Sequence, residues 1–317
     1  MIRSRKGEYV QKFVYYAILS DSFRKQVELG WNYGTQQNIG MNVLENLSIA
    51  CPSSAIIQEK IAAYLDGRCS EIDAVIAAKQ KQNDLLKKQR QSIIYEAVTK
   101  GLDTSVKYKT SGVESIGEIP EKWEVQRLKY LTKQPLQYGA NETGEDFDEV
   151  LPRYIRITDI SMDNKLKEEG KLSLSLEKAQ NYILEDGDVL FARSGATVGK
   201  SFYYSKEYGT SCFAGYLIRL SPDSRKMLGR FAYYFTLSNA YNDWINMIFI
   251  QSTIQNISAE KYNNLFLPVP PIIEQRTIID YLDAKCAEID AIVDSNDAII
   301  AKLKEYRQSI IYEAVTG

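Results

Sequence analysis

The chain of 317 residues contains 44% hydrophobic and 25% charged residues, which is typical of folded globular proteins and leaves room for two domains. It has no histidine, and its four cysteines lack CxxC spacing, which argues against a zinc site and against Ser-His-Asp or Cys-His catalysis. The formal net charge of −2 excludes a strongly basic chain, and no apolar run indicates a signal peptide or a membrane span, so we expect a cytoplasmic protein without cofactors.

An internal duplication organises the chain. Residues 12–20 match residues 230–238, and residues 90–99 are identical to residues 307–316. Tyr15 and Tyr16 stand where Tyr233 and Tyr234 recur, and we expect most of these four side chains in the core. The repeat distance far exceeds the roughly 20 to 50 residues of a solenoid unit. A whole module is therefore duplicated, with its first copy shortened at the amino end.

Two segments, residues 54–99 and 272–316, are predicted to form long helices. Neither contains an internal proline, and prolines lie just before both. Because a long helix with one narrow apolar stripe is unstable alone, we expect the two to pack along each other as a coiled-coil spacer; ordinary bundle helices are the alternative. The apolar residues at helical spacing are Ile61, Leu65, Ile72 and Ile76 in the first segment and Ile278, Leu282, Ile289 and Val293 in the second.

The sequence between the two helices predicts a β-rich globular domain, which makes the fold class α+β. Short runs of β-branched and aromatic residues, separated by Gly, Asn, Asp and Ser, indicate strands at residues 151–157, 188–192, 201–204 and 215–220. One helix is predicted at residues 226–247.

A glycine-containing loop follows the strand at residues 188–192. It resembles a phosphate-binding P-loop, but Ser194 stands where that motif requires its first glycine, and a strand follows in place of a helix. Two interpretations remain. The loop is a plain glycine hairpin, or it brings a polar set against a DNA backbone, because small residues allow close approach. That set is Arg193, Ser194, Thr197 and Lys200.

A second polar segment lies near residue 255. Asparagine and glutamine can bind adenine N6 and N7 together, so this segment is suited to base reading; a solvated loop or a helix cap is the alternative. Its candidate residues are Gln251, Thr253, Gln255 and Asn256. The stretch around the first loop predicts a local basic face, because Arg193, Lys200, Lys206, Arg219, Arg225, Lys226 and Arg230 outnumber Glu207 and Asp223.

Three motifs together resemble the specificity subunit of type I restriction-modification systems. They are residues 117–123 (Gly-Glu-Ile-Pro-Glu-Lys-Trp), residues 187–193 (Gly-Asp-Val-Leu-Phe-Ala-Arg) with Gly195 and Gly199-Lys200, and residues 268–275 (Pro-Val-Pro-Pro-Ile-Ile-Glu-Gln). No single motif is specific. The combination with the duplicated helices is specific, and the resemblance covers essentially the whole chain.

The resemblance implies a protein without catalytic residues that reads double-stranded DNA. In this family, two target-recognition domains each read half of a bipartite site, and two long helical regions pair antiparallel and dock DNA methyltransferase (modification) subunits. A restriction/translocase subunit adds ATP-driven restriction. The chain then divides into a remnant of a first target-recognition domain (1–53), a first helical spacer (54–101), a complete target-recognition domain (102–270) and a second helical spacer (271–317).

The sequence departs from this family in its first domain, of which only the tail is present. Two hypotheses follow. The chain is a half-subunit that dimerises to read a symmetric site, or it is a truncated form that pairs with a separate amino-terminal fragment. The alternative function is a non-enzymatic coiled-coil scaffold with a β-rich binding domain.

Overall fold

The computed structural model describes residues 9–30, 39–161, 164–195, 197–250 and 256–317. They form two compact units, one made of residues 1–86 and 289–317 and the other of residues 87–288. Two long helices, α4 (Ala55–Lys100) and α9 (Ile272–Thr316), contribute a part to each unit. The helices predicted at residues 54–99 and 272–316 are therefore confirmed, and each of them would reach about 70 Å at 1.5 Å per residue.

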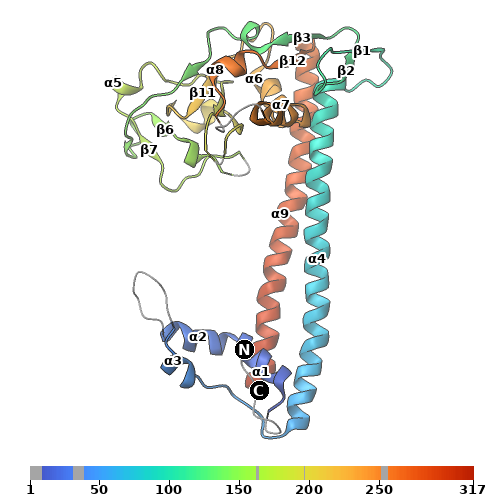
Figure 1. Cartoon of the computed structure of the whole chain (residues 1–317), viewed down its shortest axis with the longest axis vertical. Coiled ribbons are helices and arrows are strands. Elements are labelled where there is room, and N and C mark those ends of the chain that lie inside the picture. The colour runs from blue at the N-terminus through green and yellow to red at the C-terminus, as the bar shows by residue number, and fades with distance from the viewer. Residues whose placement is uncertain (1–8, 31–38, 162–163, 196, 251–255) are drawn as a thin grey trace. The chain divides into compact units, whose positions relative to one another are not determined.

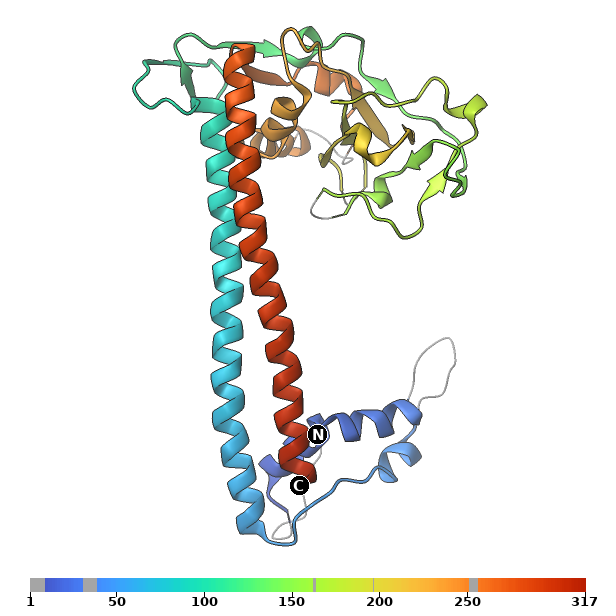
Figure 2. The same ribbon diagram turned by 180° about the vertical axis from the view of Figure 1, so that it is seen from behind.

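In the first unit, α4 and α9 run antiparallel side by side (Figures 1 and 2). The Arg68 guanidinium lies 3.4 Å from the Tyr306 hydroxyl, whereas the Asn83 amide donates to Asp297 at 2.8 Å. The residue number of the partner on α9 decreases as the residue number on α4 increases, so the two helices run antiparallel. Three residues of the predicted α4 stripe, Leu65, Ile72 and Ile76, are buried between them in one cluster with Cys69, Ile300, Ile310 and Ile311, whereas the predicted Val293 of α9 is only partly buried.

A buried polar layer interrupts this apolar contact. Asn83 and Asn296 are 5% and 3% exposed, and the Asn296 amide donates to the Asn83 carbonyl oxygen at 2.8 Å. The Asn296 carbonyl oxygen accepts a hydrogen bond from the Lys79 ammonium at 2.9 Å. A shift of one helix along the other would leave these buried groups unpaired, so the layer fixes the register of the pair.

Replacing Asn296 by leucine should lower the free energy of unfolding by about 1–3 kcal/mol, because the buried Asn83 carbonyl oxygen loses its donor. The double replacement Asn83→Leu with Asn296→Leu should be close to neutral or stabilising, since two apolar side chains then face each other. Urea unfolding of the three proteins tests this. If Asn296→Leu were as stable as the double variant, the hydrogen bond between Asn83 and Asn296 would not stabilise the helix pair.

Three short helices complete the first unit: α1 (Gln11–Leu19), α2 (Asp21–Leu29) and α3 (Met41–Glu45). Phe13 and Tyr16 of α1 are buried in the same cluster as α4. The Tyr16 hydroxyl donates to Asp66 of α4 at 2.9 Å, and the Lys12 ammonium also binds this carboxylate. Tyr15, by contrast, is 55% exposed and lies outside the core, whereas Tyr16 and Tyr234 are 4% and 2% exposed and Tyr233 is partly buried.

The second unit contains all strands found in the described residues. They are β1 (Tyr108–Thr110), β2 (Glu118–Pro120), β3 (Glu124–Arg127), β4 (Gln137–Tyr138), β5 (Glu145–Asp146), β6 (Arg153–Ile155), β7 (Leu172–Ser173), β8 (Val189–Ala192), β9 (Ser201–Tyr203), β10 (Ser211–Phe213), β11 (Leu217–Leu220) and β12 (Phe266–Val269). The short helices are η1 (Leu128–Tyr130), η2 (Ile157–Asp159), α5 (Leu176–Ala179), η3 (Lys206–Tyr208), α6 (Gly229–Thr236), α7 (Asn239–Ile250) and α8 (Ala259–Asn263). All four predicted strands are present, as β6, β8, β9 and β11.

The strands form two four-stranded sheets and two pairs. The central sheet has the order β4-β11-β8-β9 and is antiparallel throughout. The second sheet, β10-β6-β7-β5, is mixed, because β10 and β6 run parallel. Strand β3 pairs with β12 and β1 with β2. Helix α8 packs on the central sheet, where the Tyr262 and Phe191 rings stack with centroids 4.4 Å apart.

The single helix predicted at residues 226–247 is wrong, because two helices occupy this stretch. Helix α6 ends at Thr236, and α7 begins at Asn239. The hydroxyl of the fully buried Ser238 donates to the Phe235 carbonyl at 2.7 Å, and the Ser238 carbonyl then accepts from Asn242 at the start of α7. A serine side chain that bonds nearby backbone competes with helix hydrogen bonds, which explains the break.

Two of the motifs join the β-rich domain to the start of α9. Trp123 is 1% exposed, and its indole N–H donates to the Glu274 carboxylate at 3.0 Å. Gln275 is fully buried and accepts from the Leu228 amide at 2.8 Å while its own amide donates to the Lys226 and Pro270 carbonyls. These motifs therefore stabilise the second unit.

Candidate nucleic-acid interface

The loop between β8 and β9 is a glycine hairpin. The Ala192 amide donates to the Lys200 carbonyl at 2.8 Å, and the Gly199 amide returns to the Ala192 carbonyl at the same distance. Gly195 and Gly199 have φ angles of +78° and +84°, a region in which side chains are strained. The loop is therefore a hairpin, and its contact with a DNA backbone stays a prediction; the strand β9 after it rules out the helix that a P-loop needs.

A buried ion pair joins the two strands next to the hairpin, β8 and β11. Asp188 is 1% exposed and lies 2.7 Å from the Arg219 guanidinium of the neighbouring strand β11. Its carboxylate also accepts from the Ser221 hydroxyl at 2.6 Å and the Glu185 amide at 2.7 Å. Burial raises the pKa of Asp188, while these hydrogen bonds and the Arg219 charge act in the opposite direction. The Gly187-Asp188 motif thus anchors two strands.

Internal contacts occupy part of the expected local basic face. Arg219 is buried against Asp188, Arg230 pairs with Asp283 at 2.7 Å, and Arg225 pairs with Asp223 at 2.9 Å. The Arg225 guanidinium lowers the pKa of Asp223 to about 2, although its own side chain is 86% exposed. The exposed Lys226 ammonium donates to the Tyr130 carbonyl at 3.1 Å. Burial thus removes Arg219 from the expected face, and Arg193 and Lys200 are the two cations that lie on the hairpin.

Arg193 directly follows β8 and is half-buried. Its guanidinium lies over the Tyr138 ring, with 4.8 Å between the guanidinium carbon and the ring centroid. Its Nε is buried without a hydrogen-bond partner, and in the described part of the chain no carboxylate pairs with it. Its backbone is held on both sides, because its amide donates to the Tyr216 carbonyl at 3.0 Å and its carbonyl accepts from Ile257 at 2.9 Å.

The second polar segment reaches the hairpin at Asn256. Ser194 and Asn256 form an antiparallel bridge, so these two candidates lie side by side. The Asn256 side-chain oxygen is buried without a hydrogen-bond partner. Thr197 lies in the hairpin turn, where its carbonyl accepts from the Lys200 amide at 3.0 Å. The other three candidates of this segment, Gln251, Thr253 and Gln255, lie outside the described residues.

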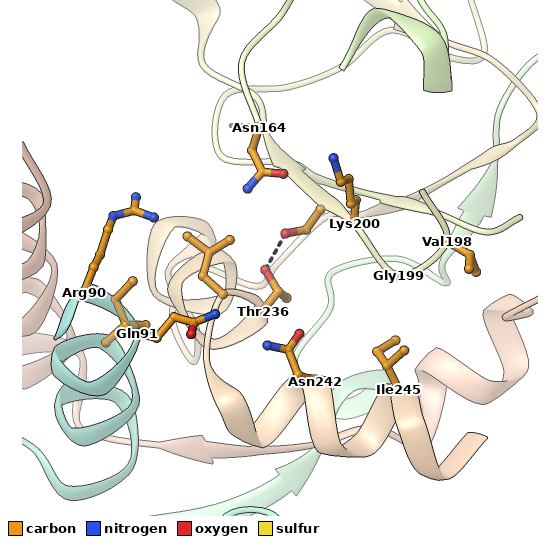
Figure 3. A pocket seen from close by; sticks show the side chains of 12 residues that line it. Arg90, Gln91, Asn164, Val198, Gly199, Lys200, Thr236, Asn242 and Ile245 are labelled. Atoms are coloured by element: carbon orange, nitrogen blue, oxygen red, sulfur yellow. Dashed lines mark hydrogen bonds between the residues drawn. The ribbon is translucent and has the colours of Figure 1, made fainter. Parts of the chain in front are cut away.

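Lys200 lines a pocket of about 290 Å³ behind the hairpin (Figure 3). Its ammonium lies 3.5 Å from the Ser161 carbonyl. No carboxylate is found among the described residues that line the pocket, so it suits a ligand rich in oxygen atoms. The other polar lining residues are Arg90, Gln91, Asn164, Ser201, Thr236 and Asn242.

Sequence reasoning missed Arg90 and Gln91 of α4 as parts of this pocket. Arg90 and Gln91 begin the segment that recurs unchanged at residues 307–316, and this repeat was the sequence signal that could have identified them. Over the described residues, we find neither a helix long and apolar enough to cross a membrane nor a group of three or more metal-binding side chains.

Comparison with known proteins places this architecture in a family. The model of the type I restriction modification DNA specificity domain matches residues 120–305, which is more than half of the chain. The EcoBI specificity subunit of Escherichia coli is 23% identical over 327 residues, covering 100% of this chain and 67% of that protein. The StySPI specificity subunit of Salmonella potsdam is 25% identical over 285 residues, covering 88% and 59% respectively.

Solved structures share the fold. A chain from a study of complex assembly and conformational transition in a type I R-M system superposes with a TM-score of 0.74 at 19% identity, covering 99% of this chain and 73% of that one. The HsdS subunit from Thermoanaerobacter tengcongensis gives a TM-score of 0.50 at 19% identity, covering 100% and 72%. The chain thus spans only 59–67% of the length of the two curated relatives above. On the extent of the family match, the chain belongs to the type I restriction-modification DNA specificity family.

Proposed function

We propose that this chain recognises a specific sequence in double-stranded DNA and has no catalytic activity of its own. Recognition is assigned to residues 102–270, with residues 54–101 and 271–317 as helical spacers and residues 1–53 as the remnant of a first recognition domain. DNA methyltransferase (modification) subunits and a restriction/translocase subunit supply the chemistry, in the cytoplasm. Family membership supports this assignment, as do relatives that are specificity subunits of type I restriction enzymes.

One observation carries the proposal: Asn256 of the second polar segment lies beside Ser194 of the hairpin. Arg193 and Lys200 provide cations that phosphate oxygens can bind, and Asn256 next to Ser194 provides an amide that can reach a base edge. Positioning on the backbone and reading of the bases need these two kinds of side chain close together.

The experiment is to map methylated sites in cells that express this chain together with its modification subunit. We expect one common sequence among the methylated sites, and its loss when the chain is omitted. Methylation that does not depend on this chain would contradict the proposal. Gel-shift titration of the complex at two salt concentrations distinguishes a sequence-specific DNA-binding protein from a scaffold. Only the DNA-binding protein shows salt-dependent binding that prefers one duplex sequence over competitors.

Three variants separate the proposed contacts. Lys200→Ala should weaken binding to every duplex to a similar extent, because a phosphate contact carries no sequence information. Asn256→Ala should instead lower the preference for the methylated sequence by about 1–3 kcal/mol, and the sequence predicts the same for Gln255→Ala. Competition gel shifts measure both effects. Unchanged affinity and unchanged preference in all three variants would place the DNA contacts elsewhere.

Helix α3 of the first unit exposes apolar side chains at positions whose counterparts in the repeat, on α8, are covered. Met41 and Leu44 of α3 are 70% and 43% exposed, whereas the residues at the matching positions of α8, Ala259 and Tyr262, are buried. Tyr262 is covered by the central sheet. We propose that α3 receives an equivalent sheet from a separate recognition domain. Light scattering decides, because a stable homodimer would favour the half-subunit hypothesis instead.

A further inference from the structure

Tyr138 contacts Arg193 of the hairpin and also Ala259, three residues beyond Asn256. It lies in β4, whose partner in the central sheet is β11, with Tyr138 opposite Ile218. The next residue, Gly139, approaches the Ala214 carbonyl oxygen so closely that a β-carbon would come within 2.4 Å of it. The backbone at Tyr138 is therefore fixed by strand pairing and by a contact that requires glycine at position 139. Its side chain remains 40% exposed.

The ring of Tyr138 holds the guanidinium of Arg193. The guanidinium carbon lies 4.8 Å from the ring centroid, within the range of a cation–π contact. Since Arg193 Nε has no hydrogen-bond partner and no ion pair holds the group in the described part of the chain, the ring is the contact that orients it. An arginine whose plane is fixed in advance loses less side-chain entropy when it binds oxygen atoms of a ligand.

The hydroxyl of the same tyrosine binds the backbone just after Asn256. It accepts a hydrogen bond from the Ala259 amide at 3.0 Å, at the first residue of α8. Asn256 lies three residues earlier and is bridged to Ser194 of the hairpin. One side chain thus joins, through opposite chemical groups, the cation that can bind the backbone and the segment that can read the bases.

We propose that Tyr138 is a positioning residue for DNA recognition, which orients Arg193 with its ring and the segment at Asn256 with its hydroxyl. The inference rests on the proposed function and assigns separate roles to the ring and the hydroxyl of Tyr138. The ring sets how strongly any DNA is bound, because Arg193 contacts the backbone. The hydroxyl sets how well the preferred sequence is distinguished, because it fixes the segment that contains Asn256.

Two substitutions of Tyr138 separate these roles. Tyr138→Leu removes the ring and the hydroxyl together, so it should weaken binding to the scrambled duplex by about 2- to 30-fold, the range expected for a cation–π contact, and should also lower the ratio of preferred to scrambled binding. The slope of log affinity against log salt should also fall by about 1, as for one lost phosphate contact. Tyr138→Phe retains the ring. It should keep the salt slope but lower the ratio of preferred to scrambled binding by about 2- to 10-fold, since one hydrogen bond is lost.

The measurement uses the full chain with its modification subunit, a duplex that carries the mapped methylation sequence, and a scrambled duplex of equal length. Tyr130→Leu is the matched control, because Tyr130 is an exposed tyrosine of the same unit whose ring contacts the Lys129 ammonium at 5.0 Å. It should leave the affinity, the salt slope and the preference unchanged. Thermal unfolding of each variant shows whether the fold is retained.

The expected pattern is a lower affinity for both duplexes, a lower salt slope and a lower preference for Tyr138→Leu, with a change in preference alone for Tyr138→Phe. The inference is overturned if Tyr138→Leu binds DNA as Tyr130→Leu does, or if the leucine and phenylalanine variants bind the scrambled duplex with the same affinity and the same salt slope. Either result, with the unaltered chain still selecting its sequence, leaves the proposed function standing. Failure of the unaltered complex to bind any duplex would overturn both.

Discussion

Replacing Asp188 by alanine should lower the free energy of unfolding of the second unit by about 3–5 kcal/mol, because it leaves the Arg219 charge buried without its partner. Arg219 is 5% exposed, and Glu185, which lies 3.5 Å from it, is mostly solvated. The Ser221 hydroxyl and the Glu185 amide lose their acceptor in the same step. Since a domain has only about 5–15 kcal/mol of stability, this loss should impair folding near body temperature.

Urea unfolding followed by tryptophan fluorescence measures the effect, because Trp123 and Trp244 both lie in the second unit. Asp186→Ala is the control two residues away. Asp186 is exposed and accepts only the Lys206 amide at 3.0 Å among the described contacts, so its loss should cost less than about 1 kcal/mol. Replacing Asp188 and Arg219 together by apolar residues of similar size should recover much of the stability. Equal destabilisation by both alanine variants would contradict the assignment.

The elements that the sequence predicted well are those with a local signal. The long helices follow from a period that continues over many turns without proline, and residues such as Leu65 and Leu282 are buried where the stripe places them. The hairpin follows from Gly195 and Gly199 between two apolar strands. The break at Ser238 could not be predicted in this way, because a serine inside a helix bonds backbone without ending it unless packing favours the turn.

The basic face shows what a sequence cannot reveal. Counting cations between residues 193 and 230 gave an excess, but Arg230 is neutralised by Asp283 on α9, outside the counted stretch. Tyr138 was missed for the same reason. It lies far along the chain from Arg193 and Ala259, and neither a motif nor a period marks it. Partners that meet through the fold are visible only in three dimensions, whereas single candidates such as Ser194 and Asn256 could be named separately.

The second large effect is expected at Gln275. Leucine at this position would fill a similar volume but remove the partner of three backbone groups: the Pro270 carbonyl, whose hydrogen bond is buried, and the Leu228 amide and Lys226 carbonyl, whose hydrogen bonds are partly buried. Each unsatisfied buried group costs about 1–3 kcal/mol, so Gln275→Leu should lower the free energy of unfolding by about 3 kcal/mol or more. The loss should detach the start of α6 from α9 and unfold the second unit first.

The duplication supplies a matched control within the chain. Gln58 of α4 is 1% exposed and plays the corresponding role in the first unit, where it accepts from the Val10 amide at 2.7 Å and donates to the Pro52 carbonyl at 2.8 Å. Gln58→Leu leaves two groups unpaired in place of three and should cost less, about 2 kcal/mol. Hydrogen exchange at the Val10 and Leu228 amides shows which unit each variant opens.

The Trp123 indole lies close to the site of the first substitution, because it binds Glu274, the residue before Gln275, and so allows the two variants to be compared. With Gln275→Leu, its fluorescence should report unfolding at a lower urea concentration, and the Leu228 amide should exchange faster. With Gln58→Leu, the Trp123 transition should stay in place while exchange increases at Val10. If the Trp123 transition moves equally in both variants, the two glutamines do not act on separate units, and the buried amide is not what fixes the recognition domain to its helix.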